Sequence, residues 1–345
     1  MINVIIIDDS ALVRKVISQE ISKDSEITVV ATAPDPIIGR DKILKHNPDV
    51  ILLDVEMPRM DGITFLKKLM KHFPIPVIIV SSLAQHGSEV AVKALEYGAV
   101  DVVPKPGGSY SVKDLGDTLI EKIKAAAKVD MKKAAILSSL NEKIIKDVEK
   151  PKRAMIKTTE KIIAIGASTG GTQALRYLIS KLPSDMPPIV IVQHMPQNFT
   201  KSFADSLNNI SKLEVKEAEN KDSLYSGRVL IAPGNKHMVL RRSGAKYYVE
   251  VKDGEQVYHQ RPSVEVLFYS VAQYAGKNSI GVMLTGMGKD GARGMLEMKK
   301  NGAYTIAQDE KTSVVFGMPK EAIDIGAVDK ILPLDNMPDF LSKFI

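Results

Sequence analysis

Short runs of apolar, mostly β-branched residues alternate with helical patterns along this chain, and this alternation is typical of α/β proteins with parallel sheets. In the first 120 residues five runs predict strands: Val4–Ile7, Thr28–Ala31, Val50–Leu53, Val77–Val80 and Val100–Val103. Helices are predicted between them, for example at Ala11–Ile21 and at Glu89–Tyr97, which Gly98 closes. We therefore expect a doubly wound parallel sheet here, with the chemistry at the carboxyl ends of its strands.

The same alternation resumes after Glu160. Strands are predicted at Lys161–Ile165, Pro188–Val192, Val229–Ala232 and Ile280–Leu284, and helices at 175–182, Phe199–Ile210 and Ser263–Tyr274, with Ser263 as the N-cap. Met238–Arg241 and Tyr247–Val251 predict a β-hairpin. A chain of 345 residues commonly holds two domains. The second is expected to be a doubly wound, mostly parallel, Rossmann-like α/β domain with a β-hairpin.

Residues 125–157 are rich in Lys, Ala and Glu and contain no strand pattern. Leu137, Leu140, Ile144 and Val148 follow one another at helical spacing, which predicts a helix within a linker. Its apolar face either packs against one domain or belongs to a solvated, frayed helix. We expect domains at 1–124 and 158–345, joined by a helical linker at 125–157.

Composition excludes several classes of function. The chain has no cysteine, which excludes disulfides and thiolate chemistry. No apolar run is long enough to span a membrane, and the acidic N-terminal sequence is unlike a signal peptide, so a cytoplasmic protein is expected. The net charge of +6 is spread along the chain, and no helix-turn-helix with a concentrated basic face follows the linker. A DNA-binding regulator is therefore disfavoured, whereas an acidic partner fits.

Polar residues follow the predicted strands of the first domain. Asp8 and Asp9 follow the first strand, Asp54 the third, Ser82 the fourth and Lys105 the fifth. Three carboxylates at one sheet edge repel one another unless a cation lies among them, and Mg²⁺ prefers a few carboxylates plus water. The lysine and the hydroxyl would hold phosphoryl oxygens. The set indicates an aspartate that accepts a phosphoryl group, the alternative being solvated strand ends.

Two aspartates after the first strand, one after the third, a serine after the fourth and Lys105-Pro106 after the fifth follow one another along residues 1–124. With this set of residues, the stretch resembles the receiver domain of two-component response regulators. The resemblance implies a flavodoxin-like (βα)5 fold. The resemblance implies that Asp54 is the phosphoacceptor. It also implies a Mg²⁺ ion bound directly by Asp9, through water by Asp8, and by Asp54 and the Glu56 backbone carbonyl.

The same resemblance assigns Ser82 and Lys105 to contacts with the phosphoryl group, and a histidine kinase as the phosphodonor. Many receivers carry an aromatic switch residue three positions before the lysine, where this chain has Val102. Phosphorylation is therefore expected to be transmitted by a different packing change.

In the second domain one serine lies on a tight turn between a buried strand and a helix. Gly166-Ala167-Ser168-Thr169-Gly170 matches the G-x-S-x-G pattern of nucleophile elbows. The turn exposes the Ser168 hydroxyl, and the helix N-terminus directs backbone N–H groups at developing negative charge. A simple turn or a phosphate cradle would give the same pattern.

His194 and Asp290 also follow predicted strands. If these strands are parallel neighbours of the one before Ser168, the three side chains share a sheet edge, as a nucleophile, its base and an orienting carboxylate require. The order Ser, His, Asp differs from that of α/β-hydrolases. His237 and His259 remain alternative bases. The glycines around Met287 free its N–H to face a developing oxyanion.

Several motifs across 160–345 together resemble the catalytic domain of the chemotaxis protein-glutamate methylesterases. They are Ile165–Gly171, Val192–Pro196, Ala232–Gly234, Arg261–Val264 and Leu284–Gly291. The resemblance implies that Ser168, His194 and Asp290 form the catalytic triad and that the Met287 N–H belongs to the oxyanion hole.

The expected function is a phosphorylation-activated serine esterase that hydrolyses glutamate γ-methyl esters on the cytoplasmic helices of chemoreceptors, without a cofactor for the ester chemistry. The same acyl-enzyme route would deamidate receptor glutamines. The alternative is a receiver joined to a non-enzymatic nucleotide- or phosphate-binding module, with Gly166–Gly171 as an anion cradle. The missing G-x-G-x-x-G and G-x-x-x-x-G-K motifs disfavour this alternative.

Overall fold

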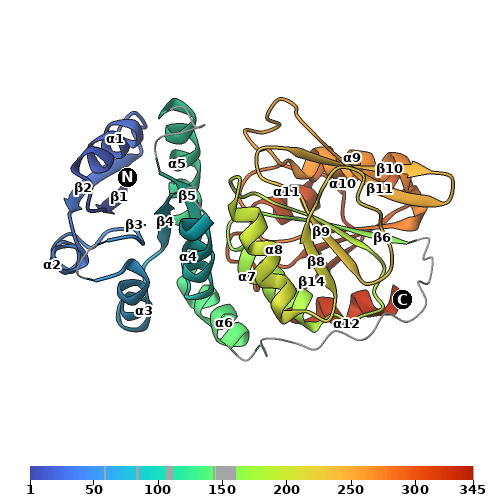
Figure 1. The fold of residues 1–345 in the computed structure, drawn as a ribbon, viewed down its shortest axis with the longest axis horizontal. Coiled ribbons are helices and arrows are strands. Elements are labelled where there is room, and N and C mark those ends of the chain that lie inside the picture. The colour runs from blue at the N-terminus through green and yellow to red at the C-terminus, as the bar shows by residue number, and fades with distance from the viewer. Residues whose placement is uncertain (58–59, 83–84, 106–111, 143, 145–160, 345) are drawn as a thin grey trace. The chain divides into compact units, whose positions relative to one another are not determined.

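The computed structural model describes residues 1–57, 60–82, 85–105, 112–142, 144 and 161–344, with no side-chain description at 85–87, 112–114 and 142. The chain divides into two compact units, Met1–Ser138 and Ser139–Ile345 (Figure 1). No helix in the described part of the chain combines the length and the apolar character needed to cross a membrane.

The N-terminal unit is a doubly wound α/β fold. Its elements are, in order, β1 (Ile2–Ile7), α1 (Ala11–Ile21), β2 (Ile27–Ala33), α2 (Pro36–His46), β3 (Val50–Asp54), α3 (Gly62–His72), β4 (Val77–Ser81), α4 (Gln85–Glu96), β5 (Asp101–Pro104) and α5 (Val112–Ala126). Within the described ranges the strands form a five-stranded parallel sheet in the order β2-β1-β3-β4-β5. This order is the flavodoxin-like one, and it confirms the predicted receiver fold.

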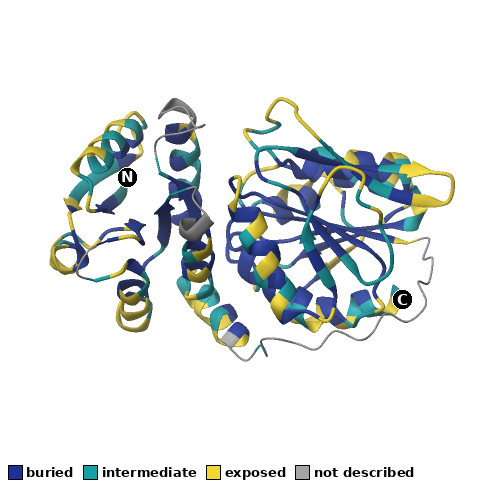
Figure 2. Ribbon diagram, viewed as in Figure 1, coloured by how far each residue is buried: buried dark blue, intermediate teal, exposed yellow. Residues whose placement is uncertain are grey.

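Helices cover both faces of this sheet, and this explains why the sequences of the central strands are continuous apolar runs. β3, β4 and β5 are buried at every position, and the strands lie in the dark blue interior of the unit in Figure 2. On one face Ile17 of α1 and Leu119 of α5 pack on the sheet. A parallel strand covered on both faces has no solvent side, so polar residues are confined to its ends.

Helix α6 (Met131–Glu142) lies in the predicted linker. Leu137 is buried, whereas Leu140 is 36% exposed. The predicted continuation of the helix to Ile144 is wrong. The Ile144 N–H donates to the Asn141 carbonyl three residues earlier, a tighter turn that is common where α-helices end. Val148 lies outside the described residues.

The C-terminal unit is also α/β. Its elements are β6 (Ile162–Ala167), α7 (Gly171–Lys181), β7 (Ile189–Gln193), α8 (Phe199–Ile210), β8 (Glu214–Glu217), β9 (Arg228–Ile231), β10 (His237–Ser243), β11 (Lys246–Lys252), α9 (Val264–Tyr274), β12 (Ser279–Met283), α10 (Ala292–Lys300), β13 (Tyr304–Gln308), α11 (Met318–Asp324), β14 (Lys330–Leu332) and α12 (Met337–Leu341). The main sheet, as far as the chain is described, has seven parallel strands in the order β14-β13-β12-β6-β7-β9-β8. β10 and β11 form the predicted antiparallel hairpin.

Two helical layers cover this sheet. α7 contacts α8 and α12 on one face, and α10 contacts α9 and α11 on the other, where α9 also supports the hairpin (Figure 1). Strand order reverses between β12 and β6, because the chain runs outward from β6 through β7 before it returns to β12. Ligands bind at such switch points in open α/β sheets.

Candidate active site and phosphorylation site

The ends of three neighbouring strands form the candidate active site in the C-terminal unit. β6 pairs in parallel with β12 on one side and with β7 on the other. Beyond the strands, the His194 N–H donates to the Ala167 carbonyl and the Ser168 N–H donates to the Thr285 carbonyl, both at 3.1 Å. The expectation that these strands are parallel neighbours is confirmed, and the segments that carry Ser168 and His194 lie side by side.

Ser168 follows β6 directly, on a turn that only small residues fit. A Cβ atom on Gly166 would lie 2.3 Å from a Val264 methyl group. Gly170 has a φ of +76° and packs against Val314. The close approach at Gly166 brings the first turn of α9 against the turn that holds the serine. Ser168 itself is only 9% exposed.

A buried acid orients the histidine. His194 Nε2 lies 2.7 Å from Asp290 Oδ2, and the two residues are 5% and 2% exposed. The same carboxylate accepts hydrogen bonds from the Ser263 hydroxyl and from the backbone N–H groups of Val264 and Glu265 at the N-terminus of α9. Burial would raise the pKa of Asp290, but the hydrogen bonds from His194, Ser263 and Glu265 outweigh it and the pKa is lowered. Asp290 is therefore held as a carboxylate.

The orientation of the ring leaves His194 Nδ1 for a second partner. No hydrogen bond between the Ser168 hydroxyl and His194 is present in the part of the chain that the structure describes, and such contacts often tighten only when substrate is bound. Of the alternative bases, His237 is buried and uses both ring nitrogens, Nε2 at 2.8 Å from the Glu255 carbonyl and Nδ1 at 3.3 Å from the Ser263 N–H. His259 is exposed.

The loop after β12 is fixed beside the serine. The Thr285 hydroxyl donates to the Val315 carbonyl and accepts from the Val315 N–H, while the Gly286 N–H donates to the same carbonyl. A Cβ on Gly286 would lie 2.7 Å from Ser168 Cβ, so the loop runs directly past the serine. Among the described residues no acceptor is found for the Met287 N–H. A free donor next to a fixed serine is the arrangement that an oxyanion hole needs.

Sequence reasoning did not assign several residues that support this site. Gln193 donates from Nε2 to the backbone carbonyls of Ser168 and His194, at 3.0 and 3.3 Å, and so ties the two loops together. Ser263 is the predicted N-cap of α9, but its hydroxyl also donates to Asp290. The signal for Gln193 is a polar residue at the last position of an apolar strand. The signal for Ser263 is the Arg261–Val264 motif.

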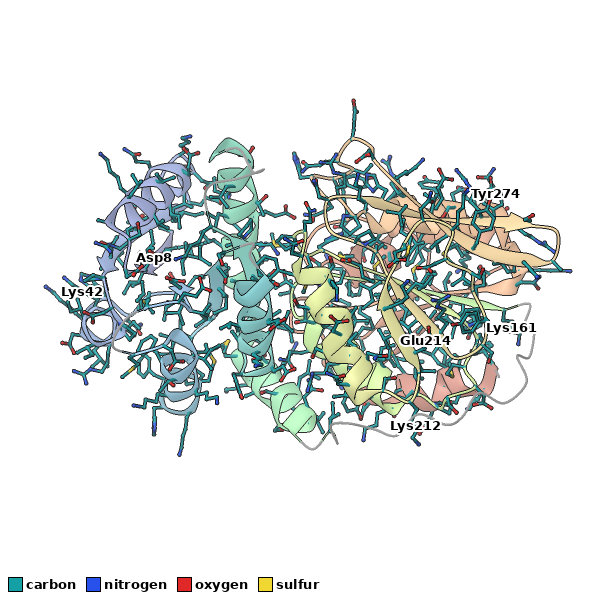
Figure 3. All side chains as sticks on the ribbon, viewed as in Figure 1. Asp8, Lys42, Lys161, Lys212, Glu214 and Tyr274 are labelled. Carbon is teal, nitrogen blue, oxygen red and sulfur yellow. The ribbon has the colours of Figure 1, made fainter. Side chains whose placement is uncertain are left out.

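The predicted phosphorylation site lies at the sheet edge of the N-terminal unit. Carboxylate oxygens of Asp8, Asp9 and Asp54 lie within 4.8 Å of one another. Lys105 Nζ lies 2.7 Å from Asp54 Oδ2 and 3.2 Å from Asp8 Oδ2. Asp8 is labelled in Figure 3, in the N-terminal unit. The sheet brings together residues from three segments that lie far apart in the sequence, namely Asp8 with Asp9, Asp54, and Lys105.

These side chains fit a small, hard cation. Asp8 and Asp54 are buried, and Asp9 is exposed. Asp8 Oδ2 forms an ion pair with Lys105, but it accepts no hydrogen bond within the described residues. Burial raises the pKa of Asp54 to about 6, although hydrogen bonds from Lys105 and from the Glu56 N–H act in the opposite direction. Three carboxylates, of which Asp54 is strongly desolvated, match the oxygen ligands that Mg²⁺ prefers.

The remaining predicted residues lie around this edge. Ser82 follows β4 directly and is half-buried, and Glu56 follows β3 by two residues and is exposed. Val102 is buried in β5, opposite Ile79 of β4. A change at Ser82 or Lys105 would therefore reach packed residues of β4 and β5.

Two family models match the chain. The CheB methylesterase model matches residues 163–341, and the response regulator receiver domain model matches residues 4–115. The first therefore covers the candidate active site, and the second contains the acidic cluster, Ser82 and Lys105.

Relatives match along nearly the whole chain. A protein of Syntrophus aciditrophicus, named protein-glutamate methylesterase/protein-glutamine glutaminase 2, is 55% identical over 100% of this chain and 99% of its own length. A protein-glutamate methylesterase/protein-glutamine glutaminase of Sulfurimonas denitrificans is 53% identical over 97% of this chain and 96% of its own length. The crystal structure of the Thermotoga maritima CheB methylesterase catalytic domain is 42% identical with a TM-score of 0.53, and it covers 54% of this chain and 98% of that chain.

Proposed function

Because this chain belongs to the CheB methylesterase family and carries a response regulator receiver domain, we propose that it is a serine esterase under phosphorylation control that acts in chemotactic adaptation. Its substrates are glutamate γ-methyl esters on the cytoplasmic helices of chemotaxis receptors. The observation that carries the proposal is the buried His194–Asp290 pair next to the turn that presents Ser168.

In the proposed acylation step the Ser168 hydroxyl attacks the ester carbonyl. His194 accepts the hydroxyl proton at Nδ1, the ring nitrogen that faces away from Asp290. The Asp290 carboxylate holds the Nε2 proton and stabilises the imidazolium that forms. His194 then donates the proton to the leaving methoxide, and methanol departs from an acyl-Ser168 ester.

In the deacylation step His194 removes a proton from water, which attacks the acyl-enzyme. The receptor glutamate carboxylate leaves, and the proton returns to Ser168. A receptor glutamine follows the same route, with ammonia in place of methanol. The protein-glutamine glutaminase activity in the names of the relatives is consistent with this shared intermediate.

The Met287 N–H is the proposed oxyanion donor. Replacing Met287 with proline deletes this N–H and should lower kcat about 10²–10³-fold, the usual loss for one such donor. Replacing Met287 with alanine keeps the N–H and should leave kcat near the wild-type value. Both variants are compared by methanol release, with circular dichroism to verify folding. A folded Met287→Pro protein with wild-type kcat would exclude the assignment.

In the receiver we propose that Asp54 accepts a phosphoryl group from the histidine kinase of the pathway. Mg²⁺ would be held by Asp8, Asp9, Asp54 and the backbone carbonyl of Glu56, and it would neutralise charge on the transferring phosphoryl group. Lys105 already contacts Asp54, and it would pair with a phosphoryl oxygen while the Ser82 hydroxyl binds another.

Phosphorylation is proposed to relieve an inhibition of the catalytic domain by the receiver. The proposed parts are a receiver at 1–124, a linker at 125–157 and a catalytic domain at 158–345. A fragment 158–345 should be at least about tenfold more active on receptors than the whole unphosphorylated chain, which requires a difference of about 1.4 kcal/mol between two states. Equal activity of fragment and whole chain would contradict inhibition, and the receiver would then activate by organising the catalytic domain.

The phosphoacceptor is tested by Asp54→Asn, which should abolish stimulation by a small-molecule phosphodonor and leave basal activity unchanged. Asp41→Asn is the matched control, because Asp41 is an exposed acid of the same unit whose only ion pair within the described residues is with its neighbour Arg40. Stimulation that survives in Asp54→Asn would place the phosphoryl group elsewhere.

The partners follow from this chemistry. We propose that the protein acts in the cytoplasm, on the receptor helices and with the kinase as phosphodonor, without membrane insertion or nucleic-acid binding. The function is tested by incubating the protein with receptor-containing membranes whose glutamates carry radiolabelled methyl esters. Release of methanol is expected, and its absence from the fragment and the phosphorylated chain alike would refute the proposed esterase.

A further inference from the structure

A second buried acid lies beside the proposed triad, and the mechanism above does not use it. Glu265 belongs to the first turn of α9 and is 5% exposed. Its Oε2 accepts hydrogen bonds from the Gly291 N–H at 3.1 Å and from the Gly294 N–H at 3.0 Å. Both donors belong to the N-terminal turn of α10 or its cap.

The same residue contacts Asp290 from the other side. The Glu265 backbone N–H donates to Asp290 Oδ1 at 3.0 Å. Gly291, whose N–H binds the Glu265 carboxylate, is joined to Asp290 by a peptide bond. Glu265 therefore fixes Asp290 at two points, through the Asp290 carboxylate and through the peptide group that follows it.

The two helix N-termini thus cap each other. Asp290 accepts from the first turn of α9, and Glu265 accepts from the first turn of α10, so each acid satisfies backbone donors that would otherwise be unpaired. Glycines allow the close approach. Gly291 has a φ of +89°, and a Cβ on Gly294 would lie 3.0 Å from the Glu265 carbonyl oxygen.

Two buried acids at close range are unfavourable unless hydrogen bonds or opposite charges compensate each of them, and here backbone N–H groups do so. Burial, followed by the charge of Asp290, raises the pKa of Glu265 above its usual value, and the Gly294 and Gly291 N–H groups and the charge of Arg293 offset this only in part. A single cap would satisfy either helix alone. The reciprocal arrangement also fixes where the Asp290 carboxylate lies relative to the His194 ring.

We propose that Glu265 is a positioning residue for the esterase reaction, which holds the Asp290 carboxylate in line with His194 Nε2 by hydrogen-bonding the N-terminal turn of α10. The inference rests on the proposed triad of Ser168, His194 and Asp290. Glu265 touches neither the substrate nor the reacting atoms in this role.

Steady-state methanol release from the full-length phosphorylated protein tests the proposal. Glu265→Ala should lower kcat about 10–100-fold with little change in KM, because a misplaced orienting group weakens chemistry rather than receptor binding. Glu265→Gln keeps a carbonyl acceptor of the same reach and should retain kcat within about fivefold of wild type. Glu297→Ala removes a more exposed acid of α10 that pairs with Lys300, and it should leave kcat unchanged.

Folding is separated from positioning by two further measurements. Activities are normalised to the folded fraction, which thermal melts provide. If Glu265→Ala does not accumulate, Glu265→Asp replaces it. The shorter aspartate carboxylate cannot reach both the Gly291 and the Gly294 N–H groups, so this variant should show the same fall in kcat. In an Asp290→Asn background the Glu265 substitution should have almost no further effect on kcat.

Three results would overturn the role of Glu265. The first is a wild-type kcat in folded Glu265→Ala or Glu265→Asp. The second is a Glu265→Gln variant whose kcat is as low as that of Glu265→Ala. The third is a double variant in which the effects of the Glu265 and Asp290 substitutions on kcat multiply. A failure of the proposed triad would be distinguished from a failure of the Glu265 role by the Asp290→Asn variant. If the triad assignment is wrong, this variant alone would retain wild-type activity.

Discussion

Replacing Ser168 with alanine is expected to lower kcat for methyl-ester hydrolysis by about 10³–10⁶-fold, since the variant has no oxygen nucleophile on the turn after β6. Oriented water would then be the only nucleophile near His194, and the residual rate would come from binding and from the oxyanion donor. The measurement is methanol release from receptor membranes under single-turnover conditions, where product release does not limit the rate.

The fold should tolerate this substitution. The Ser168 hydroxyl makes no hydrogen bond to the described residues, and its removal therefore leaves no buried partner unsatisfied. The free energy of unfolding is therefore expected to change by no more than about 0.5 kcal/mol. Ser180→Ala is the matched control, because Ser180 lies on α7 and, within the described residues, its hydroxyl donates only to the Tyr177 carbonyl. More than a tenth of wild-type activity in Ser168→Ala would exclude Ser168 as the nucleophile.

The strands that carry the site could be predicted because their signals are local. β6, β7 and β12 are short apolar runs, and their burial on both faces leaves the polar residues at and just beyond the strand ends as the visible mark of function. Ser168 and His194 follow their strands directly, so their position at the sheet edge followed from the sequence. The same logic placed Asp54 and Lys105 together in the receiver.

The contacts of Asp290 with the N-terminus of α9 could not be predicted in this way, although its role as the partner of the histidine base was. Asp290 lies seven residues beyond β12, and its carboxylate is positioned by the N-terminus of α9, a helix that precedes β12 in the chain. Pairing of β12 with β6 is also non-local, because more than 100 residues separate them. Periodicity reports on one element at a time, and it carries no information about which helix end meets which loop.

Elements with weak periodic signals were missed for a related reason. β8 reads Glu-Val-Lys-Glu, an edge strand with one fully buried position, and β14 has three residues. Such edge strands need few apolar residues, because most of their side chains remain at least partly exposed to solvent. In the linker helix the prediction was too long instead. The apolar residues keep their helical spacing through Ile144, whereas the helix ends at Glu142.

A double-mutant cycle on His194 and Asp290 is expected to show strong non-additivity. Asp290→Asn should lower kcat about 10⁴-fold, as loss of the orienting carboxylate does in other serine hydrolases. His194→Ala should lower kcat by at least as much, and the double variant should be no slower than the slower single variant, because triad members act as a unit. His259→Ala provides the control pair, since His259 is exposed and its small effect should simply multiply with that of Asp290→Asn.

The cycle also separates catalysis from stability. The Asp290 carboxylate accepts hydrogen bonds from His194, from the Ser263 hydroxyl and from two backbone N–H groups, whereas an asparagine NH₂ group can accept none of them. Asp290→Asn should therefore destabilise the C-terminal unit by about 1–3 kcal/mol, whereas His194→Ala removes one partner and should destabilise it less. If the two kinetic effects multiply instead, His194 is not the partner of Asp290 in the reaction. The contact at 2.7 Å would then serve only to hold the loop after β12 against α9.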